Sequence, residues 1–150
     1  MVITQVIGGL GNQMFQYAVG RSLALRDNTT VRLDISGFEN YGLHQGFELQ
    51  LVFTCPIEIA SATDVQDILG WQSSRIIRRL LQRLNWSILC LQGLIVEHHF
   101  NYWSGLSRAP RNSYLVAYWQ SEKYFLDIAS TIRADFTFRL PLDIRNRELA

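Results

Sequence analysis

The feature that most constrains the fold is a glycine-rich turn near the start of the chain, between an apolar run and a helical pattern. Residues 2–7 include four valine or isoleucine residues, which favours a strand buried on both faces, as in a parallel sheet. Gly8, Gly9 and Gly11 follow, and glycine lets a ligand approach the backbone closely. Residues 29–36 alternate in polarity and predict a second strand. Strand, helix and strand predict a right-handed βαβ unit.

The helix after the turn should end at Asp27 and Asn28. Its predicted buried stripe has helical spacing and includes Met14, Phe15, Ala18, Ser22 and Leu25. Ala18 and Ser22 are small, so they should let the helix lie close to the sheet. The start of such a helix carries unpaired N–H groups and partial positive charge, which predicts an anion site there.

The rest of the chain predicts further elements of an α/β fold. Strands are expected at residues 47–53, 93–100 and 113–120, with loops at 37–47 and 101–112. Helices are expected from a cap at Ser61 or Thr63 to Gly70, over Ser73 to Leu84, and after a cap at Ser121. In the last helix, Phe125, Ile128, Ala129 and Ile132 should share one face.

The length of 150 residues fits one domain, and the net charge of +1 gives no reason to expect a nucleic-acid partner. No secretory signal and no apolar stretch of membrane-spanning length is visible, so a cytoplasmic protein is expected. Cys55 and Cys90 lack metal-ligand spacing and are predicted to be buried free thiols. His98 and His99 would point to opposite faces of a strand, so no metal site is expected.

The predicted helix Ser73 to Leu84 carries arginines on one face and leucine or isoleucine residues on the other. A basic amphipathic helix can lie on an anionic membrane, which would place the protein at the periphery of the inner membrane. The same pattern also describes a helix that packs on the core and exposes its arginines to solvent. Both interpretations stay open.

Three ligand interpretations compete for the glycine turn. A dinucleotide fingerprint matches partly, because Met14 takes the place of its third glycine although Asp34 lies about 20 residues further on, where an acid can hold a ribose. A Walker A loop is excluded, since no lysine precedes Lys123. In a nucleotide-sugar loop, Asn12 and Gln13 would donate amide hydrogen bonds to phosphate oxygens. Without a ligand, Asn12 would be the helix N-cap and Gln13 an exposed residue of the first turn.

Two separate segments resemble one enzyme family. The string GGLGNQMFQYAVGRSLAL, from Gly8, resembles the N-terminal motif of bacterial α-1,2-fucosyltransferases, glycosyltransferase family 11. The segment from Ala117 to Phe138 is similar to the family's G-Y-[FW]-Q-S-E-K-Y-F segment, with Ala117 in the glycine position. The resemblance implies inverting transfer of L-fucose from GDP-fucose to a galactose hydroxyl of a glycan, without a metal or other cofactor. It implies a GT-B fold and places Gly9, Gly11, Asn12 and Gln13 at the donor diphosphate and sugar.

The family's H-x-R-R-G-D segment does not occur in these 150 residues. We therefore expect the N-terminal half of such an enzyme: a Rossmann-like domain over 1–140, a tail or linker over 141–150, and no C-terminal donor-binding domain. That chain should be inactive alone and should self-associate through its exposed domain face. His44 is a candidate acceptor contact, and the catalytic base is not assigned among Asp34, Glu39, Glu48 and Glu97. The alternative is a non-catalytic nucleotide-binding module, such as an NAD-binding domain.

Overall fold

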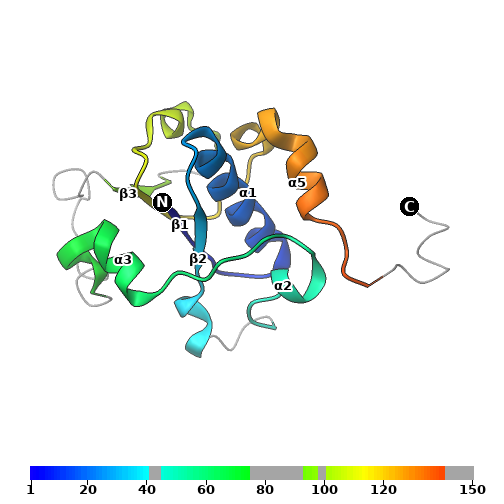
Figure 1. The fold of residues 1–150 in the computed structure, drawn as a ribbon, viewed down its shortest axis with the longest axis horizontal. Coiled ribbons are helices and arrows are strands. Elements are labelled where there is room, and N and C mark those ends of the chain that lie inside the picture. Colours follow the sequence, from blue (N-terminus) through cyan, green and yellow to red (C-terminus); the bar gives the residue numbers. More distant parts are fainter. Residues whose placement is uncertain (41–44, 75–92, 98–100, 141–150) are drawn as a thin grey trace.

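The computed structural model describes residues 1–40, 45–74, 93–97 and 101–140, and these contain a four-stranded parallel sheet (Figure 1). Its strands are β1 (Val2–Gln5), β2 (Val31–Asp34), β3 (Leu94–Val96) and β4 (Ser113–Val116). They lie in the order β2-β1-β4-β3, so the first strand is central. Val2 pairs with Val31 on one side and with Ser113 on the other. The predicted α/β class with a Rossmann-like parallel sheet is confirmed.

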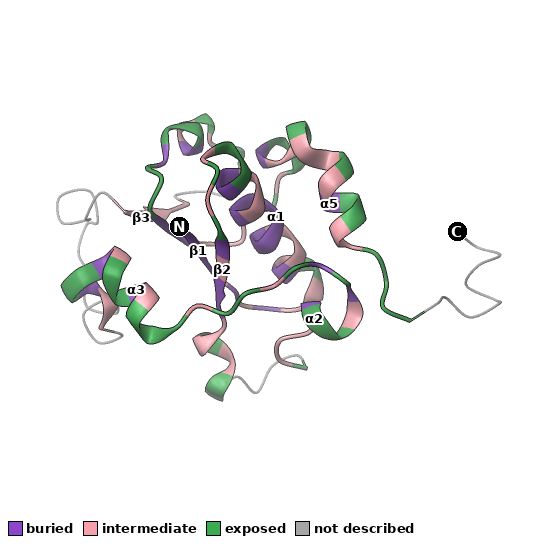
Figure 2. Cartoon of the chain, viewed as in Figure 1, coloured by how far each residue is buried: buried purple, intermediate pink, exposed green. Residues whose placement is uncertain are grey.

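Helices cover both faces of this sheet (Figure 1). The long helix α1 (Leu10–Arg26) packs on one face, where Val2 and Leu115 belong to the larger apolar core. Helix α3 (Ala62–Leu69) packs on the other face, where Val65 and Leu69 contact Ile3 and Tyr114. Alternate strand residues therefore enter different cores, as period-two geometry requires. Figure 2 shows the buried residues concentrated in the central strands and α1.

The predicted buried stripe of α1 is wrong in part. Ala18 is buried, but Leu25 is exposed and Ser22 is only half-buried. The residue that lets the helix approach the sheet is Gly20, because a Cβ atom there would lie 2.2 Å from the Thr4 hydroxyl oxygen. The buried residues of α1 are Gln13, Gln16, Tyr17, Ala18, Val19, Gly20, Leu23 and Ala24. They cover more than one stripe because α1 also contacts α2 and the segment Glu122–Tyr124.

Residues 47–53 form no strand, and that prediction is wrong. They contain helix α2 (Leu49–Val52). Leu49 and Phe53 are buried while Leu51 between them is 69% exposed, so burial follows a four-residue spacing and not the two-residue spacing of a strand. The prediction for α3 is confirmed, because the Ser61 hydroxyl accepts from the backbone N–H of Asp64 and the Asp64 carboxylate accepts from that of Ser61.

Residues 113–135 form shorter elements than the strand and helix that the sequence predicted. β4 ends at Val116, because Ala117 and Trp119 take φ angles of 156° and 55°. Residues after Ser121 form two 3₁₀ turns, η5 (Glu122–Tyr124) and η6 (Leu126–Ile128), before helix α5 (Ala129–Asp135). The Ser121 side chain makes no capping bond, and of the predicted face only Ile132 is buried.

Other predictions fall partly or wholly outside the described residues. The predicted basic helix Ser73 to Leu84 does so from residue 75 onward, while Ser73 belongs to the 3₁₀ turn η2 (Gly70–Ser73). Cys90, His44, His98, His99 and the tail over 141–150 also lie outside. Within the part that is described, Cys55 is a buried free thiol, as expected. No helix of that part has the length and apolarity needed to cross a membrane.

Candidate functional site

The candidate site lies at the carboxyl ends of β1 and β4. From β1 the chain passes through α1 to β2 on one side, whereas β4 lies on the other side of β1. The connections that leave two neighbouring strands therefore run to opposite sides. At such a point a crevice forms outside the carboxyl ends of the strands, and open α/β sheets bind ligands there. The loops that meet there are residues 6–9, before α1, and residues 117–121, after β4.

The glycine turn places the start of α1 at this edge. Gly8 has a φ of +81°, and a Cβ atom there would lie 2.6 Å from the Asn12 side-chain nitrogen, so both conformation and space favour glycine. Gly9 is the helix N-cap and makes no side-chain capping bond, so the interpretation of Asn12 as the N-cap is wrong. The first helical hydrogen bond runs from the Gln13 N–H to the Gly9 carbonyl at 3.2 Å. The N–H groups before Gln13 have no acceptor inside the helix.

Asn12 joins this turn to the loop after β4. Its side-chain oxygen accepts a hydrogen bond of 2.7 Å from the Gln120 side chain. One turn further along the helix, the Gln16 side chain donates to the Ala117 carbonyl at 3.0 Å and accepts from the Ile7 N–H at 3.1 Å. Two polar side chains of α1 therefore hold together segments that lie more than 100 residues apart in the sequence.

Gln13 faces the interior and is fully buried, which overturns its interpretation as an exposed first-turn residue. Its side-chain nitrogen donates to the carbonyls of Gly8 at 2.9 Å and Gly46 at 2.8 Å. Its side-chain oxygen accepts from the Glu48 N–H at 2.9 Å. Both amide hydrogens are thus engaged with backbone oxygens, and the side chain fixes the glycine turn against residues 46–48.

The predicted site residues therefore differ in accessibility. Gly11 is exposed, and a Cβ atom added there would lie in open space, while Gly9 and Asn12 are half-buried. These three lie at the helix start, and Gln13 lies behind them. His44 is outside the described residues, but Phe38 and Phe47 on either side of that gap have ring centroids 6.2 Å apart.

The acidic residue Asp34, at the end of β2, is only 4% exposed. One carboxylate oxygen accepts from the Ser36 N–H at 2.9 Å, and the other accepts from the Tyr114 hydroxyl. It lines a cavity of about 440 Å³ between β2 and the start of α3. Because both of its oxygens already accept bonds from the protein, Asp34 is poorly placed for the ribose contact of a dinucleotide site.

Glu97, at the end of β3, braces the loop after β4. Its carboxylate accepts from the Trp119 N–H at 3.1 Å and from the Tyr124 hydroxyl at 3.2 Å. The Tyr124 hydroxyl oxygen in turn accepts from the Trp103 N–H at 2.9 Å. Burial, together with the charge of Glu97, raises the pKa of Tyr124. The sequence signal for this contact was limited to an acidic residue inside the predicted strand 93–100, which did not identify its partners.

No group of three or more histidine, cysteine or acidic residues within the described ranges is arranged to hold a metal ion. What the site presents is a helix start with free N–H groups, the side-chain amides of Asn12 and Gln120, and a loop after β4 that is bonded to Glu97. Hydrogen-bond donors and partial positive charge are the groups that bind phosphate oxygens. The arrangement can therefore hold an anionic group.

Comparison with known proteins adds one relative. No protein-family model matches the chain, and no solved structure matches it. The alpha-1,2-colitosyltransferase of Escherichia coli is 29% identical over 137 residues, which is 91% of this chain and 45% of that protein. The chain thus spans less than half the length of this curated relative. Over nearly all of its own length, the chain is related to a glycosyltransferase.

Proposed function

We propose that this chain forms the N-terminal part of an inverting fucosyltransferase, which transfers L-fucose from GDP-fucose to a galactose hydroxyl of a glycan in α-1,2 linkage. One observation carries the proposal. The two segments that resemble the α-1,2-fucosyltransferases meet at the carboxyl edge of the sheet, through the Asn12–Gln120 and Gln16–Ala117 hydrogen bonds. Similarity to a glycosyltransferase over the same residues supports it.

In this proposal the start of α1 binds the donor diphosphate. Backbone N–H groups around Gly9 and Gly11 donate to phosphate oxygens, and the side-chain nitrogen of Asn12 adds a further donor. Gln13 contributes by holding the glycine turn in place, since its own amide group is bonded to Gly8 and Gly46. Donors fixed in advance stabilise the negative charge that grows on the departing diphosphate, which is usually the largest catalytic effect. The helix start then performs this role without a metal ion.

The identity of the transferred sugar is the most specific part of the proposal. The relative's name gives colitose as the transferred sugar, and colitose is L-fucose without its 3-hydroxyl group. A site that donates or accepts a hydrogen bond at that hydroxyl rejects the sugar that lacks it, because a buried polar group is then left unpaired. Comparing the GDP-activated forms of the two sugars therefore tests the choice of fucose.

The relative is more than twice as long as this chain, so we propose that a second domain supplies the guanine pocket and the cation that faces the diphosphate. Residues 1–150 alone should then bind GDP-sugars weakly and transfer none. Transfer of fucose to a galactoside by these residues alone would contradict this part of the proposal.

The decisive experiment is a titration of ¹⁵N-labelled protein with GDP, GDP-fucose, GDP-colitose and NAD. We expect GDP-fucose to shift the amide signals of residues 9–12 and 117–120, and NAD to leave them unchanged. Gly11→Asp is the informative variant, because Gly11 is exposed with open space around it. An aspartate in the first turn stabilises a helix by about 0.3–1 kcal/mol but repels a diphosphate.

Gly11→Asp should therefore raise the melting temperature and abolish the GDP-dependent shifts, whereas the matched control Gly11→Ala should keep them. If Gly11→Asp binds GDP as well as the unchanged protein does, the diphosphate does not lie at the helix start. If NAD shifts the same amides and GDP does not, the chain is a dinucleotide-binding module.

A further inference from the structure

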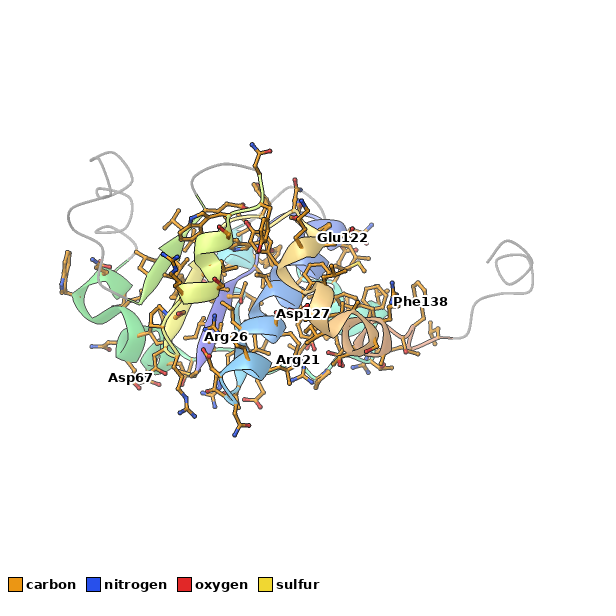
Figure 3. The ribbon with its side chains drawn as sticks, turned by 90° about the horizontal axis from the view of Figure 1, so that it is seen from above. Arg21, Arg26, Asp67, Glu122, Asp127 and Phe138 are labelled. Atoms are coloured by element: carbon orange, nitrogen blue, oxygen red, sulfur yellow. The ribbon has the colours of Figure 1, made fainter. Side chains whose placement is uncertain are left out.

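We propose that a pocket beside the C-terminal half of α1 is a second carbohydrate site, which binds an uncharged hexose of a glycan. The pocket has a volume of about 440 Å³, within the usual range for small-molecule sites. It lies between α1, the 3₁₀ turn η4 (Ser104–Arg108) and the turns η5 and η6. Two of its lining residues are labelled in Figure 3: Arg26, near the end of α1, and Asp127, on η6.

A cluster of aromatic rings packs at one side of the pocket, which Tyr102 and Tyr124 line. Tyr102 is 42% exposed and contacts Tyr124, with ring centroids 5.0 Å apart and ring planes inclined by 47°. Tyr124 packs edge-on against the fully buried Trp119 at 5.6 Å, and its hydroxyl is bonded to Glu97. The exposed ring is thus supported from behind by two rings in fixed positions. A rigid, exposed aromatic face is suited to the apolar C–H face of a sugar ring.

The charged groups that line the pocket are Arg26, Lys123 and Asp127, and the charge of Arg26 is balanced by Asp27, with which it forms an ion pair. Lys123 and Asp127 line it with opposite charges, and the ammonium of Lys123 lies 5.8 Å from the centre of the Tyr102 ring. Asp127 makes no hydrogen bond or ion pair with any residue that the structure describes. The guanidinium of Arg26 is already bonded to Asp27 and to the carbonyls of Ser107 and Ala109.

This set of groups selects the class of ligand. A phosphate requires several converging cationic donors, and a cation requires several carboxylates. The Asp127 carboxylate, which has no partner among the described residues, and the Lys123 ammonium over the Tyr102 ring instead match a neutral polyol with hydroxyl groups on its edge. A hexose is the ligand of that description which a glycosyltransferase encounters.

The pocket is distinct from the donor site. Its α1 residues, Ser22 to Arg26, lie ten to fourteen residues beyond Asn12 on the same helix. At 1.5 Å per residue, the separation along the axis is roughly 15–20 Å. A hexose bound there would belong to a part of the glycan distant from the transferred sugar. The inference rests on the proposed function only in expecting a glycan as the ligand. The geometry of the pocket does not depend on it.

The test is a titration of the ¹⁵N-labelled protein with lactose, in the absence of any nucleotide. We expect weak, millimolar binding that shifts the amide signals of residues 102–107 and 123–128. Tyr102→Ala should weaken that binding about fivefold to tenfold, whereas Tyr102→Phe, which keeps the ring, should retain it. Trp71→Ala is the matched control, because Trp71 is another exposed aromatic residue and does not line the pocket.

The outcomes separate this proposal from the donor proposal. Gly11→Asp, which should abolish GDP binding, should leave the lactose-dependent shifts of the pocket unchanged. If lactose shifts no amide of the pocket, or if Tyr102→Ala binds lactose as the Trp71→Ala control does, the proposal is wrong. If GDP shifts these amides and lactose does not, the pocket is a nucleotide site and the proposal is equally wrong.

Discussion

The side chain of Gln120 donates a hydrogen bond of 2.7 Å to the side-chain oxygen of Asn12, which joins the loop after β4 to the first turn of α1. This bond orients Asn12, because it leaves the side-chain nitrogen of that residue as the donor available to a ligand. Gln120 is exposed, and such a bond contributes only about 1 kcal/mol to stability. Its importance is therefore in positioning.

Replacing Asn12 or Gln120 with alanine should affect ligand binding more than folding. Asn12→Ala removes a donor to a charged phosphate, which should weaken GDP-fucose binding about tenfold or more. Gln120→Ala removes only the orienting bond, so its effect should be smaller. In the double variant the effects should not add, because both changes act through Asn12. Because binding to these residues alone should be weak, titration followed by amide chemical shifts measures all three, and Gln66→Ala, on the exposed side of α3, is the control. Additive losses would contradict the orienting role of Gln120.

Ala117→Gly should stabilise the protein. Ala117 has a φ of 156°, a region that glycine adopts freely and alanine does not. Relief of about 1–3 kcal/mol of strain should exceed the 0.4–1 kcal/mol or so lost to the greater freedom of glycine in the unfolded chain. Ala129→Gly, in the first turn of α5 with ordinary helical angles, should instead destabilise by up to about 1 kcal/mol. Urea unfolding of the two variants should thus show shifts of opposite sign, and a loss of stability in Ala117→Gly would refute the strain.

The parts of the fold that could be predicted from the sequence are those fixed by local patterns. The βαβ unit at residues 2–34 follows from an apolar run, a glycine turn and a helical spacing within one short segment. Helix α3 was predictable from its capping box, since Ser61 and Asp64 are only three residues apart. These interactions lie within the residues that display the pattern.

The errors concern features that distant contacts decide. Gln13 and Gln16 are polar, so the sequence placed them outside the buried stripe of α1. They are buried because their amides bond to the backbone of Gly46 and Ala117, which no local pattern reveals. In the segment after Ser121, where one helix was expected, the Tyr124 hydroxyl donates to Glu97, a contact that no local pattern reveals either. The glycine turn of the candidate site was predictable, but its link to Gln120 was not.

Gly20→Ala should destabilise the protein, because α1 lies against β1 at this residue. An added Cβ would lie 2.2 Å from the Thr4 hydroxyl oxygen and 2.9 Å from a methyl carbon of Val31. Both partners are buried, so relief requires the helix to move away from the sheet, at a cost of about 1–3 kcal/mol. Gly11→Ala makes the same chemical change in open space on the same helix and should stabilise by up to about 1 kcal/mol. Thermal unfolding that ranks the two variants the other way would contradict this packing.

The stability of the protein should fall as the pH rises above about 9, in part because of Cys55. Burial, with a smaller effect of the Asp135 charge, raises the pKa of the Cys55 thiol from its ordinary value of 9.0 to about 11. Between these values the unfolded chain has released the thiol proton and the folded chain retains it. The folded state binds more protons there, so the free energy of unfolding decreases with pH.

The difference of about two pKa units corresponds to a loss of at most about 2–3 kcal/mol from this thiol. Burial and the hydrogen bond to Asp135 also raise the pKa of Tyr17, which adds to the slope in the same direction. Cys55→Ala lowers stability at neutral pH by removing a buried atom, but its stability should decline less steeply from about pH 8 to about pH 11 than that of the unchanged protein. Urea unfolding at a series of pH values measures the two slopes. Parallel plots of unfolding free energy against pH would mean that the thiol has the same pKa in the folded and unfolded states, which would contradict the prediction. A shallower plot for Cys55→Ala would show that the folded protein keeps the thiol protonated in the core beside Asp135.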